Sequence, residues 1–285
     1  KVWNASRYIL SLLPEGFKPR KPELSELSFV DKWIYSELDK LLDSVKSNMD
    51  KYELGQAANY VYDFVYGKFC SDYLEYTKVT FQGNDEKQKT VTINVLYDIL
   101  KQILIALFPF APFITEEIYS YLPMHKKSIY EENYPLSSGI SYPSSDIQLA
   151  ESLNDAIRAI RNHKSENGLA PNAPIDLVFL GKEDFFDKTS PYLTRFGFCK
   201  NLTMTKEKSS DLIYFSSFAL TIKDEDNNET KKAIEKRIEY LKNEIERSKK
   251  MLANPNFISK AKPEKVAAEK DKYEKNVAEL KKYQK

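Results

Sequence analysis

The sequence has few of the residues that build turn-rich, disulfide-linked or zinc-binding proteins. Its 285 residues include only 8 Gly, 13 Pro and 2 Cys. So few turn formers favour long helices over an all-β fold. The two cysteines, Cys70 and Cys199, form no CxxC pair. Their separation argues against a disulfide framework and against a zinc site, and it fits a reducing cytoplasm.

Segments that mark membrane or secreted proteins are also missing from the sequence. The longest apolar run, Ile103–Phe113, is broken by Pro109 and Pro112 and is shorter than the about 18 residues that span a bilayer. No secretory signal is present. We therefore expect a cytoplasmic protein without a membrane partner. Because the chain opens inside an amphipathic pattern, without Met or an N-cap, we also expect the C-terminal piece of a longer protein.

Residue patterns typical of a catalytic centre do not occur. The sequence has no glycine-rich phosphate loop, no HExxH and no nucleophile elbow. His125 and His163 have no ligand partner nearby in the sequence, so we expect them at the surface or in structural roles. Asp72 and Glu75 could form an acid–base pair, but no nucleophile accompanies them. We predict that the chain has no catalytic residue and no metal site.

Charge is balanced over the whole chain but unevenly distributed along it. The formal net charge is +1, yet residues 231–285 carry 17 Lys and Arg against 9 Asp and Glu. The preceding residues carry 26 against 33. A basic terminal segment on an acidic body suggests an anionic partner for that segment.

Apolar residues recur every three or four positions through the first part of the chain, which predicts helices. Ser28 is a plausible N-cap, with Asp31 three residues later. The predicted helices cover about 1–13, 28–45, 54–78, 91–107 and 113–122. We expect them to form a helix bundle in residues 1–147.

Two further parts follow the bundle. Residues 148–222 combine helical segments with three short β-rich runs and a first strand at Ile175–Phe179, which predicts a small α+β module. Residues 230–285 carry a heptad stripe that an Asn-Pro-Asn turn interrupts. They are expected to form an antiparallel two-helix coiled coil. The predicted fold class is therefore mainly α.

The most informative stretch of the sequence is 60–78. It places apolar residues at helical spacings and ends in two acids, Asp72 and Glu75. One interpretation is a core helix with a solvated edge. The other is a surface that reads a second molecule, because aromatic rings stack on unpaired bases and a Glu accepts a hydrogen bond from the cytosine amine. The apolar residues of the stretch are Val61, Phe64, Val65, Phe69 and Leu74.

Several segments resemble one family, the class I valyl-, isoleucyl- and leucyl-tRNA synthetases. The first four similar segments lie in the anticodon-binding bundle of these enzymes. With the segments that follow, the resemblance covers nearly the whole chain. The similar segments are KVWNASRY at 1–8, YELGQAA at 52–58, FCSDYLE at 69–75 and PFAPFITEE at 109–117. Two more segments resemble the valyl members: AIRAIRN at 156–162, and LANPNF at 252–257 followed by Lys260, Ala261 and Pro263.

The resemblance implies roles for individual residues. Tyr8, Leu74 and Glu75 match positions that contact the anticodon loop, although the family usually has Phe where this chain has Tyr8. The valine anticodon has C at its third position, whose amine suits Glu75. Arg247 and Lys272 match positions on the two hairpin arms that contact the outer corner of tRNA. We also expect Arg158 and Arg161, on one helix face, to contact phosphate.

The resemblance further implies what the longer parent does. The parent would attach valine to its tRNA with ATP and Mg, both bound in a catalytic domain outside this chain, so the chain itself needs no cofactor. Its partner would be tRNA specific for valine, with no DNA and no membrane partner, and it would be a monomer. Two alternatives remain: the same region of an isoleucyl or leucyl enzyme, and a non-enzymatic helical protein whose coiled coil pairs with another.

Overall fold

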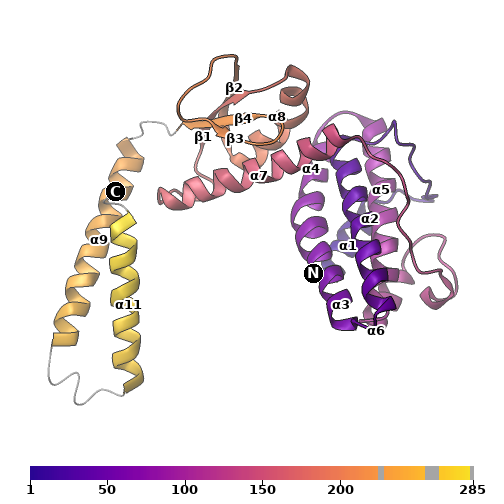
Figure 1. Cartoon of the computed structure of the whole chain (residues 1–285), viewed down its shortest axis with the longest axis horizontal. Coiled ribbons are helices and arrows are strands. Elements are labelled where there is room, and N and C mark those ends of the chain that lie inside the picture. Colours follow the sequence, from indigo (N-terminus) through magenta and orange to yellow (C-terminus); the bar gives the residue numbers. More distant parts are fainter. Residues whose placement is uncertain (224–227, 254–262, 283–285) are drawn as a thin grey trace. The chain divides into compact units, whose positions relative to one another are not determined.

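The computed structural model describes residues 1–223, 228–253 and 263–282. Helices dominate, as expected for a mainly α fold, and a small mixed sheet accompanies them (Figure 1). The chain forms two compact units. The first comprises Lys1–Asp155, Gly181–Arg195 and Tyr214–Phe218; the second comprises Ala156–Leu180, Phe196–Ile213 and Ala219–Lys285. The predicted interruption at Asn254–Asn256 lies outside the described residues.

The first unit is built on a bundle of helices (Figure 1). Its large buried side chains include Trp33, Phe69, Tyr73 and Tyr119, which come from three different elements and pack into one core. The elements are α1 (Val2–Leu12), α2 (Phe29–Asp50), α3 (Leu54–Asp63), the π-helix η1 (Phe64–Tyr73), α4 (Leu74–Gln82), α5 (Glu86–Leu107), α6 (Pro112–Tyr119), the 3₁₀ turn η2 (Ile129–Glu131) and the first half of α7 (Ser144–Glu166).

Helix α2 begins where the sequence predicted. The Ser28 hydroxyl accepts a hydrogen bond from the backbone N–H of Asp31 at 3.2 Å, and the Asp31 carboxylate accepts one from the backbone N–H of Ser28 at 3.0 Å. This capping box satisfies two backbone donors that a helix N-terminus otherwise leaves unpaired. The predicted N-cap is therefore confirmed.

Helix α5 is the apolar helix of the bundle. By length and composition alone it could cross a membrane, but 67% of its most apolar stretch is buried inside the protein. That burial is typical of the central helix of a folded domain. The prolines that follow it, Pro109 and Pro112, end α5 and start α6 as the sequence indicates.

One uniform α-helix over 54–78 was expected, and this detail is wrong. The segment is helical throughout, but Phe64–Tyr73 forms a π-helix with wider turns. The backbone N–H of Leu74 donates to the carbonyl of Phe69, five residues earlier. The predicted apolar face, in contrast, is confirmed, because all five of its residues are buried.

A four-stranded sheet forms in the second part of the chain, as the α+β prediction required. Strand β1 (Ile175–Leu180) pairs in parallel with β2 (Cys199–Thr205) and antiparallel with β4 (Ala219–Lys223). The strand order is β2-β1-β4-β3, with β3 at Ile213–Tyr214. Helix α8 (Glu183–Gly197) connects the two parallel strands, because a parallel pair needs a crossover. The predicted boundary at 147 falls inside the continuous helix α7.

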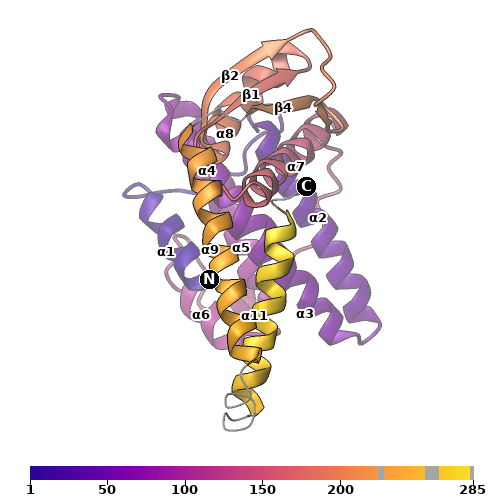
Figure 2. The same cartoon turned by 90° about the vertical axis from the view of Figure 1, so that its left-hand side faces the viewer.

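Helices α9 (Asn228–Ala253) and α11 (Pro263–Lys282) lie side by side and run antiparallel (Figures 1 and 2). The Ser248 hydroxyl donates to the Glu269 carboxylate at 2.6 Å, and Lys272 donates to Glu244 at 2.6 Å. The heptad stripe predicted in α9 comprises Ile234, Ile238, Leu241, Ile245, Ser248 and Leu252, and of these Leu241 and Ser248 are fully buried. The stripe therefore faces the partner helix at these two positions.

Candidate nucleic-acid interface

A pocket of about 320 Å³ lies between α1 and the end of the segment 64–78. It contains all three residues that the sequence predicted to contact an anticodon, Tyr8, Leu74 and Glu75. Tyr8 is more than sixty positions from Leu74 and Glu75 in the chain, so only the packing of the two elements brings them together. The complete lining is Lys1, Asn4, Ala5, Tyr8, Cys70, Leu74, Glu75 and Lys78.

Helical spacing explains which side chains line the pocket. The α1 side contributes residues 1, 4, 5 and 8, which share one helix face. The opposite wall uses Cys70, Leu74 and Lys78, four residues apart. Lys1, Asn4 and Lys78 also line the pocket but were not predicted from the sequence. Helical spacing could have indicated all three. Lys1 lies seven and Asn4 four positions before Tyr8, and Lys78 lies four positions after Leu74.

Tyr8 presents a half-buried ring to the pocket. Burial raises the pKa of its hydroxyl; the nearby Lys78 ammonium opposes that shift and the Glu75 carboxylate adds to it. The hydroxyl therefore stays protonated at neutral pH and can both donate and accept a hydrogen bond. A flat ring with a polar tip suits a base that is stacked and hydrogen-bonded at once.

Glu75 forms an ion pair with Lys78 at 2.5 Å, through Oε1. The Glu75 side chain is 42% exposed and that of Lys78 is 36% exposed. An ion pair with this much solvent access stabilises a protein by only about 0–1 kcal/mol. A ligand amine can therefore replace Lys78 as the partner of the carboxylate at small cost. The freed ammonium would then be available to a phosphate.

Leu74 and Cys70 form the apolar floor of the pocket. Leu74 is only 6% exposed, so it belongs to the bundle core and can offer a ligand no more than one edge. Cys70 is half-buried, and burial raises the pKa of its thiol, which keeps the thiol protonated. Asp72 is not among the residues that line the pocket. The structure therefore does not join Asp72 and Glu75 in one site.

The two predicted hairpin cations meet at one carboxylate. Glu244 accepts hydrogen bonds from Lys272 of α11 at 2.6 Å and from Arg247 of α9 at 3.2 Å. These two bonds lower the pKa of Glu244, and the bond to Glu244 raises the pKa of Lys272. Glu244 therefore joins a cation from each helix of the pair. Both cations remain exposed to solvent.

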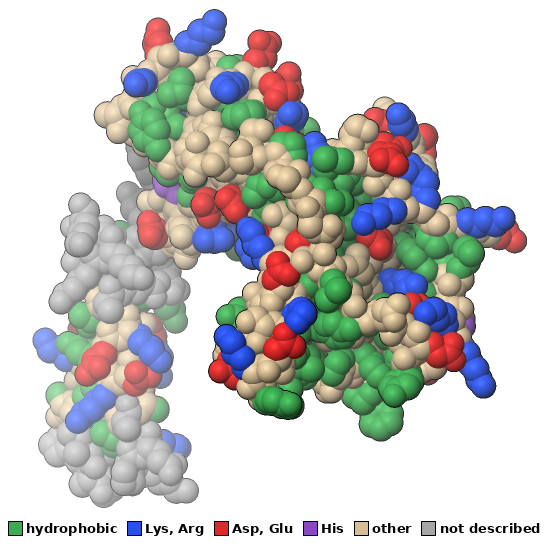
Figure 3. All heavy atoms as spheres, turned by 45° about the vertical axis from the view of Figure 1, so that its right-hand side comes forward, with side chains coloured by type: hydrophobic (Ala, Val, Ile, Leu, Met, Phe, Trp, Pro, Cys, Tyr) green, Lys and Arg blue, Asp and Glu red, His purple; other side chains and the backbone are tan. Residues whose placement is uncertain are grey.

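Arg158 and Arg161 are exposed on α7, three residues apart. Residues at this spacing share a helix face, so both side chains can reach one ligand. On the face shown in Figure 3, acidic and basic side chains are interspersed. Attraction of an anionic ligand to that face would therefore depend on local cations rather than on a field of one sign.

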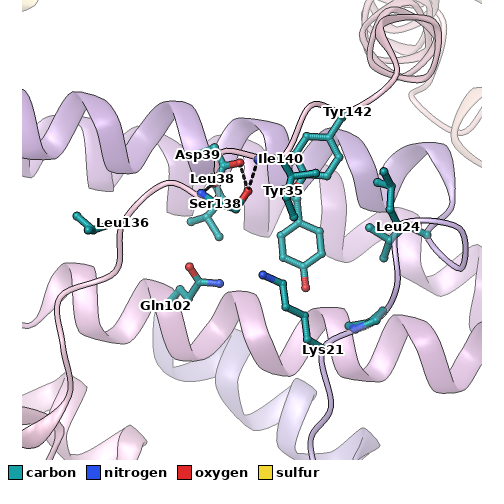
Figure 4. Close-up of a pocket in the computed structure, with 12 residues that line it drawn as sticks. Lys21, Leu24, Tyr35, Leu38, Asp39, Gln102, Leu136, Ser138, Ile140 and Tyr142 are labelled. Atoms are coloured by element: carbon teal, nitrogen blue, oxygen red, sulfur yellow. Dashed lines mark hydrogen bonds between the residues drawn. The ribbon is translucent and has the colours of Figure 1, made fainter.

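Two other hollows in the first unit differ in character from this pocket. The one in Figure 4 measures about 110 Å³ and lies where the segment 136–142 crosses α2. In its lining, Ser138 donates hydrogen bonds of 2.7 and 2.6 Å to Asp39. It is far smaller than the roughly 300 Å³ of a typical ligand site. A hollow of about 400 Å³ between α1 and α6 is large enough, but it is lined among others by Trp3, Leu10 and Tyr121 and contains none of Tyr8, Leu74 and Glu75.

Metal-binding chemistry has no support in the part of the chain that the structure describes. There, no group of three His, Cys, Asp or Glu side chains is placed to hold a metal ion.

Two family models match the chain. The family model described as the anticodon-binding domain of tRNA ligase matches residues 31–179, and the one described as the valyl tRNA synthetase tRNA binding arm matches 226–285. The chain therefore belongs to the tRNA-ligase anticodon-binding domain family. More particularly, it is a C-terminal, tRNA-binding region of the valyl-tRNA synthetase type.

Curated relatives support the same assignment. Proteins named valine–tRNA ligase from Mesoplasma florum, Mycoplasma mycoides and Clostridium perfringens are 35%, 34% and 32% identical to the chain. The matches cover 96%, 98% and 94% of this chain. The chain spans about a third of the length of these relatives, 32%, 33% and 32% respectively.

Proposed function

We propose that this chain recognises the valine tRNA for a parent valyl-tRNA synthetase, and that the pocket between α1 and residues 70–78 reads the third anticodon base. The observation that carries the proposal is the convergence of Tyr8, Leu74 and Glu75 on one pocket. Glu75 would accept a hydrogen bond from the exocyclic amine of cytosine, which uracil lacks. Tyr8 would contact the flat face of the base, and Lys1 and Lys78 would neutralise the flanking phosphates.

The helix pair α9 and α11 would act as a coiled-coil arm. Arg247 and Lys272 would contact phosphates at the outer corner of the tRNA, and Arg158 and Arg161 would add backbone contacts. Phosphate contacts carry no base identity, so they raise affinity for every tRNA alike. In this proposal the parent works as a cytoplasmic monomer. Its ATP and Mg bind elsewhere in the longer protein.

Filter binding with the chain tests the proposal. Valine tRNA transcripts carrying C or U at the third anticodon position are titrated against wild-type protein and the Glu75→Gln variant. Wild type should prefer C by about 5- to 150-fold, which corresponds to the roughly 1–3 kcal/mol of one base contact. Glu75→Gln should lose most of that preference, because its amide can also donate to uracil.

Glu86→Gln is the matched control. Glu86 forms the same i,i+3 pair with a lysine, Lys89 at 2.7 Å, but does not line the pocket. The Glu86→Gln variant should retain the preference for C over U. Equal affinity of wild-type protein for both transcripts would refute the proposal. Sedimentation without RNA tests the coiled-coil alternative, since tight self-association through residues 230–285 would favour it.

A further inference from the structure

A stripe of residues at four-residue spacing runs from the pocket along the helical segment. Its members are Tyr62, Tyr66, Cys70, Leu74 and Lys78, and the last three line the pocket. The residues one position earlier form a parallel stripe that is buried throughout: Val61, Val65, Phe69 and Tyr73.

The wide turns of η1 explain why both stripes stay straight. In an α-helix, each four-residue step rotates by about 40° beyond a full turn, so three steps would carry a stripe about 120° around the axis. The i→i+5 bonds of Phe64–Tyr73 add residues to each turn and reduce that drift. Tyr66 and Tyr62 consequently continue the wall that Cys70 begins.

Tyr62 and Tyr66 already form a stacked pair. Their ring centroids are 4.2 Å apart and their planes differ by 19°. Tyr62 is 56% exposed, so this end of the stack is open to solvent. The Lys1 ammonium lies 5.1 Å from the centroid of the Tyr66 ring, and Lys1 also lines the pocket. One cation therefore borders both the pocket and the tyrosine stack.

We propose that the Tyr62–Tyr66 stack is a platform on which a second unpaired base of the same RNA loop stacks, at the open Tyr62 end. This inference rests on the proposed function and extends it to a second nucleotide. Every base has a flat π face, so the platform adds affinity without reading base identity. Lys1 would neutralise the phosphate between the two bases. The pocket would thus select the base, and the platform would add affinity for any base.

Substitutions at Tyr62 test the platform in the same filter-binding assay. Tyr62→Leu should weaken binding of valine tRNA by about 5- to 100-fold, the usual range for loss of one stacked base. The preference for C over U at the third anticodon position should not change. Tyr62→Phe keeps the ring and should bind within about twofold of wild type. Tyr130→Leu, which removes a tyrosine that is 81% exposed in η2, should bind like wild type.

The outcomes separate the platform from the pocket. If Tyr62→Leu binds as tightly as wild type while Glu75→Gln loses the preference for C, the platform is refuted and the proposed function stands. If wild-type protein shows no preference for C, the proposed function fails, and the platform fails with it. Urea unfolding of each variant excludes misfolding, and a loss of binding that Tyr62→Phe shares with Tyr62→Leu would also refute stacking.

Discussion

The Tyr73 hydroxyl donates a 2.6 Å hydrogen bond to Oδ1 of Asp31 in the interior of the bundle. The other carboxylate oxygen of Asp31 accepts from the backbone of Ser28, at the start of α2, and from Gln88 of α5 at 3.2 Å. One buried carboxyl group therefore ties α2 and α5 to the last residue of the π-helix. Leu74 and Glu75 of the pocket follow directly. The position of the pocket wall thus depends on a contact made in the core.

Removing this hydrogen bond should destabilise the bundle. Tyr73→Phe leaves the buried Asp31 carboxyl group without one of its donors, which typically costs about 1–3 kcal/mol. We expect the free energy of unfolding in urea to fall by that amount. Tyr130→Phe, at an exposed tyrosine, should change it by less than about 0.5 kcal/mol. Equal stability of the two variants would show that the bond contributes nothing.

Asp31 should make stability fall as pH rises. Burial raises the pKa of Asp31 above its usual 3.8, although hydrogen bonds from Ser28, Tyr73 and Gln88 oppose the shift. The folded state then keeps the proton to a higher pH than the unfolded state does. The contribution of Asp31 to the free energy of unfolding is therefore fully present below about pH 4 and is lost as pH rises through the pKa of the folded state. Asp31→Asn cannot titrate, so its stability measured across this range should lack the decline.

Glu132 should have the opposite effect. Burial alone would raise its pKa, but hydrogen bonds from Tyr119, Lys101 and Lys126 outweigh burial and bring the pKa to about 2. A lowered folded pKa stabilises the protein above about pH 4.5, and this contribution is lost as pH falls towards 2. Glu132→Gln should lower the free energy of unfolding by about 1–3 kcal/mol at pH 7. If the stability of Glu132→Gln falls towards pH 2 as steeply as that of the wild type, this assignment is contradicted.

The hairpin contacts should appear in the salt dependence of tRNA binding. Arg247→Ala and Lys272→Ala should each weaken all tRNAs alike and reduce the slope of log affinity against log salt by about 1. Glu244→Gln should strengthen binding, because it removes the carboxylate that now pairs with both cations. A loss of preference for C in any of these variants would contradict a role limited to phosphate.

Local signals in the sequence were sufficient for much of the fold. Ser28 and Asp31 marked the start of α2 because a capping box depends on residues three apart. Apolar spacing identified the buried face of 61–74 for a similar local reason. The resemblance to tRNA synthetases, carried by short motifs, singled out Tyr8, Leu74 and Glu75. None of these steps needed knowledge of how the helices pack.

The sequence by itself therefore determined the helical elements, the family and three of the residues that line the pocket. Only the tertiary structure decided that Phe64–Tyr73 is a π-helix and that its last residue, Tyr73, donates a hydrogen bond to Asp31 in α2. It also decided that Leu74 is mostly buried and that Lys1, Asn4 and Lys78 share its pocket. The physical reason is that α1 and the segment 70–78 meet through packing, and contacts between distant segments leave no periodic trace in the sequence.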